Sequence, residues 1–160
     1  MSWDQSTTRS GFCTYIDSKY DHSGLVDRHE NKNASSRFKE MYEGIHEVIE
    51  REKPDIVVIE DTQATAGNMA TYKTLCQLQG AIMGMCYAMG IEFRIIAVTA
   101  WRAVLGYKQG PKVKRDELKK QSLEFVKKEF GFVKSEDENE ACAINAAFHR
   151  MMSDDIDIEI

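Results

Sequence analysis

The chain has 160 residues, of which 42% are hydrophobic and 29% are charged, with 10 glycines, 2 prolines and a net charge of −5. This length suits one domain with a sizeable core, and the composition excludes a disordered, fibrous or large multidomain protein. The longest weakly polar run, residues 80–91, is too short and too rich in glycine to cross a bilayer, and the first four residues do not begin a signal peptide. We therefore expect a soluble, cytoplasmic protein without a membrane partner.

The first third of the chain has the pattern of an antiparallel β-meander. We predict strands at residues 1–4, 11–18 and 25–29, with a turn at residues 21–24. Apolar residues then recur at helical spacing from Phe38 until Pro54 ends the helix. Residues 55–60 follow as an apolar strand that is covered on both faces.

The second half of the chain alternates helices with one more buried strand. We predict a long helix over residues 68–89 and a strand over residues 92–98, joined to the previous strand by a right-handed crossover. Thr99 is a candidate cap for a short helix, a basic helix runs from about residue 114 to 130, and Ser135 with Glu138 forms a capping box for the last helix. The elements predict an α/β protein with a mixed five-stranded sheet flanked by helices.

We find no repeat and no linker that would divide the chain. We therefore predict a single domain over residues 1–152, followed by an acidic, disordered tail over residues 153–160. The four cysteines show no CxxC pair and the histidines complete no zinc motif, so reduced and mostly buried thiols are expected at Cys13, Cys76, Cys86 and Cys142.

The charge is distributed unevenly along the chain. Residues 102–134 contain ten basic and four acidic residues, a net charge of +6, which leaves −11 for the remainder. This division suits a protein that binds phosphates with one surface and uses carboxylates elsewhere for metal chemistry, although a solvated helix face would have the same composition.

Four acidic side chains occupy positions where an α/β sheet normally builds its site. Asp4 and Glu60 end predicted strands and would meet at one edge of the sheet. Asp137 and Glu140 are three residues apart on a helix and therefore share a face. Four clustered carboxylates repel one another unless divalent cations neutralise them, which is the arrangement of a two-metal phosphodiester hydrolase with ions about 3.5–4 Å apart.

Each acid also has a simpler explanation. Asp4 would suit the start of a turn, Glu60 the end of a strand, and acids in the first turn of a helix oppose its dipole, as Asp137 and Glu140 would. The combination of all four in a β-β-β-α-β-α-β frame, with a basic segment before the last helix, is more specific than any one of them.

With these motifs, nearly the whole chain resembles the RuvC-type Holliday junction resolvases of the ribonuclease H-like superfamily, and in particular their phage-borne members. The matching segments are residues 2–11, 57–60, 75–80, 99–106 and 137–144. In this sequence Glu140 stands where the family usually has Asp, and Trp101 stands where it often has Lys.

The resemblance implies a ribonuclease H-like fold and a homodimeric, Mg²⁺-dependent endonuclease that nicks two strands of a four-way DNA junction. It implies that two Mg²⁺ ions, for which Mn²⁺ would substitute, are held by Asp4, Glu60, Asp137 and Glu140. It also implies that Lys114 or Arg115 lies near the scissile phosphate. Such an enzyme would act in the cytoplasm of a prokaryotic or phage-infected cell, and no motif indicates an obligate protein partner.

We add a hypothesis for the roles within this set. Asp4 would bridge both ions, Glu60 and Glu140 would complete their shells, and Asp137 would orient the attacking water. Small residues in the segment 65–67 would let Asn68 approach DNA closely. The predicted DNA-binding residues, which would contact backbone phosphates without reading sequence, are Asn68, Arg102, Lys108, Lys112, Lys114, Arg115 and Lys119.

Three other functions compete with this one. Residues 4–8 look like the phosphate loop of sugar kinases, but those enzymes need two such domains to close around ATP and this chain supplies one. A non-catalytic branched-DNA-binding module would have no reason to retain four acids that cost stability without metal. A ribonuclease H that cleaves RNA/DNA hybrids is disfavoured by the helical end that carries Asp137 and Glu140 and by the long helix suited to dimer packing.

Overall fold

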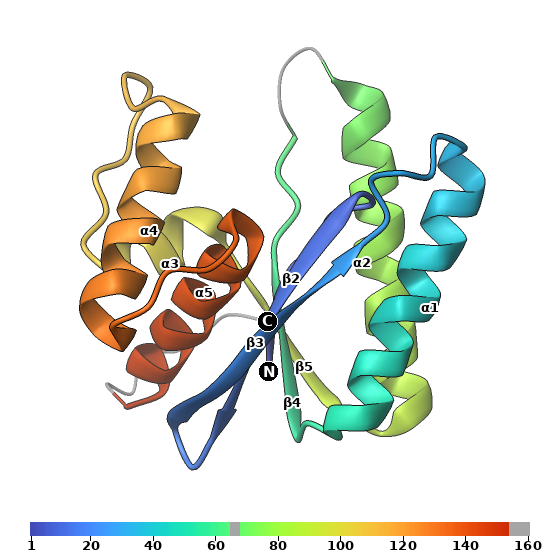
Figure 1. The fold of residues 1–160 in the computed structure, drawn as a ribbon, viewed down its shortest axis with the longest axis horizontal. Coiled ribbons are helices and arrows are strands. Elements are labelled where there is room, and N and C mark those ends of the chain that lie inside the picture. The colour runs from blue at the N-terminus through green and yellow to red at the C-terminus, as the bar shows by residue number, and fades with distance from the viewer. Residues whose placement is uncertain (65–67, 154–160) are drawn as a thin grey trace.

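The computed structural model describes residues 1–64 and 68–153, and these form three layers with a sheet in the middle (Figure 1). The sheet has the strand order β3-β2-β1-β4-β5, with β1 antiparallel to β2 and parallel to β4, so the predicted mixed five-stranded sheet is confirmed. The strands are β1 (Ser2–Asp4), β2 (Arg9–Ile16), β3 (Lys19–Asp27), β4 (Ile56–Glu60) and β5 (Glu92–Ile96). The helices are α1 (Ala34–Glu52), α2 (Met69–Met89), α3 (Val98–Val104), α4 (Arg115–Phe130) and α5 (Glu136–Ser153).

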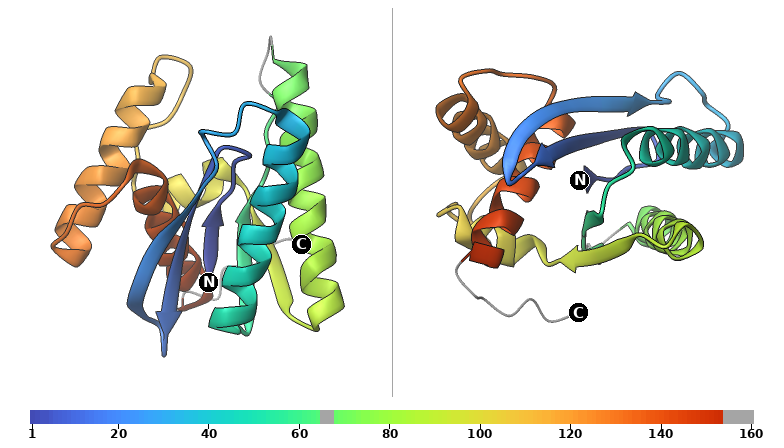
Figure 2. Two further views of the ribbon diagram at one scale, coloured as in Figure 1. Left: turned by 45° about the vertical axis from the view of Figure 1, so that its right-hand side comes forward. Right: turned by 90° about the horizontal axis from the view of Figure 1, so that it is seen from below.

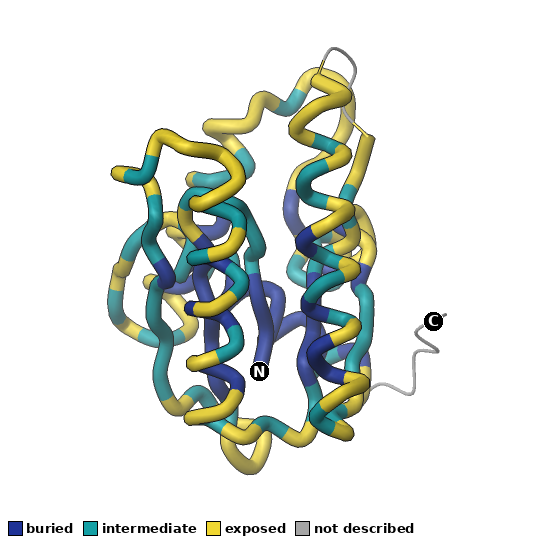
Figure 3. Tube along the Cα trace, turned by 90° about the vertical axis from the view of Figure 1, so that its right-hand side faces the viewer, coloured by how far each residue is buried: buried dark blue, intermediate teal, exposed yellow. Residues whose placement is uncertain are grey.

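The helices cover both faces of the sheet, α1 and α2 on one side and α3, α4 and α5 on the other (Figure 2). Strand β4 shows why its sequence is apolar without a break. Val57 and Ile59 pack into the core beneath α1 and α2, whereas Val58 packs against α3 and α5. The buried part of the chain is accordingly concentrated in the strands and on the inward helix faces (Figure 3).

The turn of the first hairpin is not where the sequence pattern placed it. The prediction of a turn at residues 21–24 is wrong, because β3 runs through that segment and the chain reverses at Asp17 and Ser18. Both residues have positive φ, 50° and 62°, as a two-residue type I′ turn requires. Gly24 is instead a strand residue that leaves space for a neighbouring ring. It lies opposite Phe12, and a Cβ there would meet the Phe12 ring at 2.5 Å.

Two helix starts test the capping predictions. At α5 the predicted cap is confirmed in part, since Ser135 Oγ accepts from the Glu138 backbone N–H at 3.4 Å. The Glu138 side chain accepts from the Ser135 hydroxyl, at 2.8 Å, and not from the Ser135 backbone N–H as in a complete capping box. At α3 the prediction is wrong, because the helix begins at Val98 with Ala97 as its N-cap, so Thr99 lies inside the first turn. The predicted tail lies outside the described residues from 154 onward, and Ser153 is the last residue of α5. None of the described helices combines the length and the apolar character that a membrane span needs.

Helix α5 lies unusually close to the sheet, and small and polar residues of β1 and β2 hold it there. Gly11 makes the approach possible, because a Cβ on it would lie 2.2 Å from the backbone oxygen of Asp137. Ser2 donates to the Ala141 carbonyl (2.7 Å), and Asn145 donates to the Cys13 carbonyl (2.8 Å). These contacts fix the start of α5 beside the end of β1.

Candidate active site

The four predicted acids line one cleft at the carboxyl edge of the sheet. Trp3 pairs with Ile59 in the parallel register of β1 and β4, so Asp4 and Glu60 follow side by side at the strand ends. Asp137 and Glu140 reach the same cleft from the first turns of α5. The cleft has a volume of about 900 Å³ and is also lined by residues of α2 and α4. The structure therefore brings together acids that lie up to 136 positions apart in the sequence.

These acids are difficult to ionise together. Burial raises the pKa of Asp4 well above its usual range, and the neighbouring Glu140, Glu60 and Asp137 raise it further. Burial also raises the pKa of Glu60 to about 7, although a hydrogen bond from Trp101 opposes the shift. The pKa values of Asp137 and Glu140 are raised as well, again mainly by burial. Glu140 is the neighbour that raises the pKa of Asp4 most, which makes it difficult for both carboxyls to be charged at once.

Three of the four acids have a polar or basic side chain beside them that favours their charged form. The Trp101 indole N–H donates to Glu60 Oε1 at 2.8 Å. The Arg102 guanidinium lies 4.0 Å from Glu140 Oε1, and Arg9 Nε lies 3.6 Å from Asp137 Oδ2. No basic side chain in the described ranges forms an ion pair with Asp4, whose neighbours raise rather than lower its pKa. Asp4 is therefore the acid with the greatest need of an added cation.

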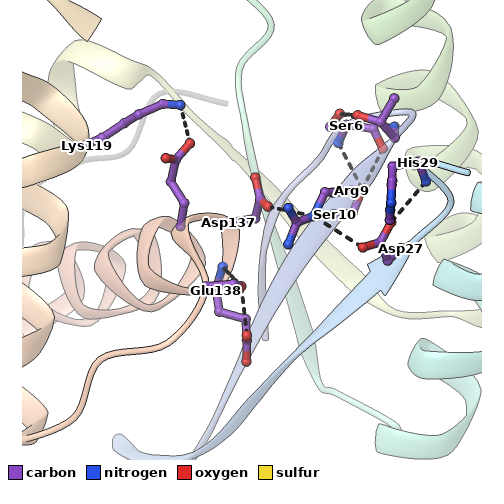
Figure 4. Close-up of polar contacts among 11 residues, drawn as sticks. Ser6, Arg9, Ser10, Asp27, His29, Lys119, Asp137 and Glu138 are labelled. Carbon is purple, nitrogen blue, oxygen red and sulfur yellow. Dashed lines mark hydrogen bonds and ion pairs between the residues drawn. The ribbon is translucent and has the colours of Figure 1, made fainter. Parts of the chain in front are cut away.

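Arg9 belongs to a chain of charges that crosses from β3 to α5 (Figure 4). Its Nε lies 3.4 Å from Asp27 Oδ2, and Asp27 in turn accepts from the backbone and the ring of His29, at 3.0 and 2.6 Å. The turn that leads to Arg9 is fixed by Ser10, whose hydroxyl contacts Ser6 N and Ser6 O at 2.9 and 2.7 Å. The sequence pattern indicated neither Arg9 nor the Trp101 contact. The signal at Arg9 was a basic residue that follows a polar turn next to a candidate acid.

The predicted basic and polar residues divide into two groups. Arg115 and Arg102 line the cleft with the acids, and Arg102 is largely buried, with 16% of its side chain exposed and its guanidinium 5.0 Å from the Trp101 ring. The structure places the others outside the cleft lining. Lys119 pairs with Glu136 and Asn68 caps α2 by accepting from Thr71 N, whereas Lys108, Lys112 and Lys114 are exposed. Residues 65–67 lie outside the described residues.

The four carboxylates of the cleft suit a hard divalent cation, although their side chains are not spaced around a single ion in this structure. Carboxylate oxygens are the ligands that Mg²⁺ prefers, and the crowded, poorly ionised acids around Asp4 are what a cation would relieve. Across residues 1–64 and 68–153, no group of three or more His, Cys, Asp and Glu side chains is spaced to hold a metal ion as it stands.

Comparisons with known proteins agree on the architecture. No family model matches the sequence, and no curated protein matches it either. Among solved structures, Thermus thermophilus RuvC in complex with a Holliday junction substrate is similar with a TM-score of 0.74 and 14% identity, over 96% of this chain and 94% of that one. A second Thermus thermophilus RuvC structure is similar with a TM-score of 0.69 and 16% identity, over 96% and 95% of the two chains. The phage origin suggested by sequence stays a prediction. The chain has the fold of the RuvC resolvases, as its sequence motifs imply.

Proposed function

We propose that this protein is a metal-dependent endonuclease that resolves four-way DNA junctions by paired nicks. The observation that carries the proposal is the meeting of Asp4, Glu60, Asp137 and Glu140 in one cleft of a chain with the RuvC fold. One of the similar RuvC structures contains a Holliday junction substrate, which is the substrate we infer for this chain. Magnesium ions, two to a site, are the inferred cofactor, and Mn²⁺ would substitute for them.

In this function the acids would hold the metal, which supplies an activated water and stabilises the leaving oxygen. Trp101 and Arg102 would keep Glu60 and Glu140 in place from the core side, and Arg9 would do the same for Asp137. Arg115, at the start of α4 in the cleft wall, is the residue best placed to contact the scissile phosphate. The exposed lysines before and along α4 would bind the backbone of the DNA arms.

The exposed face of α2 supports a homodimer as the active form. The helix carries one charged side chain, Lys73, in 21 residues. Gly80 and Gly84 have no neighbour within 4 Å of where a Cβ would lie, so a second helix would approach closely there. Two copies joined through this face would present two clefts to one junction, as paired nicking requires.

The decisive experiment uses a labelled, immobile four-way junction alongside a matched linear duplex and an RNA/DNA hybrid. With Mg²⁺, the wild type is expected to make paired nicks in the junction, and Glu60→Gln to lower the rate by about 10³-fold or more while junction binding persists. Asp55→Asn, which removes an exposed acid before β4 at the opposite end of that strand, is the matched control and should cleave normally.

Three results would contradict the proposal. Cleavage of the hybrid in preference to the junction would indicate a ribonuclease H. Junction binding without cleavage under Mg²⁺ or Mn²⁺ would indicate a non-catalytic binding module. Cleavage that persists in chelator would exclude the role given to the four acids.

A further inference from the structure

Trp101 connects the hydrophobic core to the acidic cleft. Its side chain is fully buried in α3, with its ring 5.5 Å from that of Tyr107 and 5.0 Å from the Arg102 guanidinium carbon. From this position its Nε1 donates to Glu60 Oε1 at 2.8 Å. A large side chain that is packed on all sides has little freedom to change rotamer, so the direction of its N–H is fixed by the core.

We propose that Trp101 is the positioning residue for Glu60, holding its Oε1 so that the rest of the carboxylate is presented to a divalent cation in the cleft. This inference rests on the proposed function, because it requires Glu60 to ligate metal. Glu60 Oε2 has no hydrogen-bond donor among the residues that the structure describes. One carboxylate oxygen is thus occupied by the protein and the other is available.

A neutral donor suits this task better than a charged one. The indole N–H orients the carboxylate without cancelling its charge, and it cannot accept a bond or bind the metal itself. The guanidinium groups beside Glu140 and Asp137 compete with a cation for those acids. Glu60 is therefore the acid that the protein orients through a neutral donor, and no ion pair with it is present among the described residues, which should favour metal binding at that ligand.

The chain offers a matched control in its other tryptophan. Trp3 is also fully buried, but its Nε1 has no hydrogen-bond partner in the described part of the chain. Trp→Phe at either position removes an indole from the core, whereas only Trp101→Phe removes a bond to a candidate ligand. Calorimetric titration with Mg²⁺, without DNA, should show about tenfold weaker binding for Trp101→Phe and binding within twofold of wild type for Trp3→Phe.

A spectroscopic measurement tests the contact without depending on how well Trp101→Phe folds. In Trp3→Phe, Trp101 is the one remaining tryptophan, so its emission reports on the indole beside Glu60. We expect saturating Mg²⁺ to change this emission, and the added substitution Glu60→Gln to abolish the change.

The outcomes separate this inference from the proposed function. If the wild type binds Mg²⁺ and Trp101→Phe binds it as tightly as Trp3→Phe does, the positioning role is wrong while the metal site stands. Emission from Trp101 that does not respond to bound Mg²⁺ would overturn the role in the same way. If the wild type itself binds no Mg²⁺ by calorimetry, the inference and the metal dependence fail together.

Discussion

At the scale of single residues, the cleft combines burial that opposes ionisation of the acids with neighbouring side chains that favour it. The acids are buried enough to resist ionisation, yet each of three has one donor beside it that favours the charged form. The sequence indicated the acids because their spacing places them at strand and helix ends. It did not indicate the donors, because Trp101 and Arg9 become neighbours of Glu60 and Asp137 only through tertiary packing.

The first prediction concerns pH and metal together. The pKa of Glu60 is raised from 4.5 to about 7 by burial, and that of Asp4 is raised too. A carboxyl group whose pKa is higher in the folded state stabilises the fold at a pH below its unfolded-state pKa. This stabilisation is lost as the pH rises toward the folded-state pKa. In chelator, the free energy of unfolding should therefore fall by roughly 3 kcal/mol for Glu60 between about pH 4.5 and 7. Denaturant titrations across this range measure it.

Bound metal should restore the stability that is lost as the pH rises. Mg²⁺ binds the ionised acids, so it should raise the melting temperature by several degrees at pH 8 and much less at pH 5. Glu60→Gln in chelator should flatten the pH profile. An equal effect of Mg²⁺ at both pH values would contradict the assignment of these acids as ligands.

The second prediction separates the two candidate basic residues. Arg115 lines the cleft, whereas Lys114 is the N-cap residue of α4 and lies outside the cleft lining. We expect Arg115→Ala to lower the single-turnover cleavage rate by about tenfold, and Lys114→Ala to lower it by less than about twofold at the same salt concentration. A larger loss from Lys114→Ala would reverse the assignment.

At the scale of elements, the order and type of helices and strands follow from the sequence, whereas the turn of the first hairpin and the cap of α3 do not. The apolar runs of β4 and β5 and the periodicity of α1 and α5 identify these elements correctly. The first hairpin was misplaced because Gly24 reads as a turn residue, although its real neighbour is the Phe12 ring across the strand pair. A contact between two strands is invisible in a local pattern.

The third prediction concerns the close approach of α5 to the sheet. In Gly11→Ala, the new methyl group would collide with the Asp137 backbone, so the first turn of α5 must shift. Since displacement of a catalytic group by 1 Å costs on the order of 100-fold in rate, we expect a loss of this size, with a destabilisation of about 1–3 kcal/mol. Cleavage kinetics and thermal unfolding measure the two effects.

A matched control for this variant is Gly44→Ala in α1, which lies outside the cleft. A Cβ there would meet Val26 Cγ1 at 2.6 Å, so it should also destabilise the fold, by about 1–3 kcal/mol, but leave cleavage by the folded protein unchanged. Normal activity in Gly11→Ala would show that the position of Asp137 tolerates the shift.

The fourth prediction separates two roles for Asn68. Its side chain caps α2 by accepting from Thr71 N at 3.1 Å, so Asn68→Ala should cost about 1 kcal/mol of stability. Asn68→Ser keeps a capping oxygen and should be nearly as stable as wild type. If Asn68 also contacts DNA, both variants should bind a junction severalfold more weakly in a fluorescence anisotropy titration. If both variants bind the junction as tightly as the wild type, Asn68 acts only as the cap of α2.

At the scale of the whole molecule, the cleft has two walls of different character. Helix α4 and the segment before it supply the exposed lysines, whereas α2 is nearly free of charge and offers an open face. The net charge of −5 conceals this division. The uneven distribution of charge along the sequence indicated the basic segment. Which of its residues reach the cleft depends on how α4 packs against α5, and this cannot be read from the sequence.

The fifth prediction tests the open face of α2. Gly84→Arg places a long charged side chain where a second helix would approach, so it should convert a dimer into a monomer in sedimentation or light-scattering measurements. Paired nicks should then give way to single ones. Glu47→Arg, on the exposed side of α1, introduces the same side chain elsewhere and should leave the dimer intact. A wild-type protein that is monomeric both alone and on a junction would contradict the dimer.

The chain order of the acids has a consequence during synthesis. Asp4 and Glu60 are synthesised before Asp137 and Glu140, which arrive with α5, the last helix among the described residues. Until that helix docks against Gly11, half of the acid set is missing. Under the proposed function, a chain that stops before α5 would lack half of the proposed metal ligands, and it would therefore be unable to cut DNA.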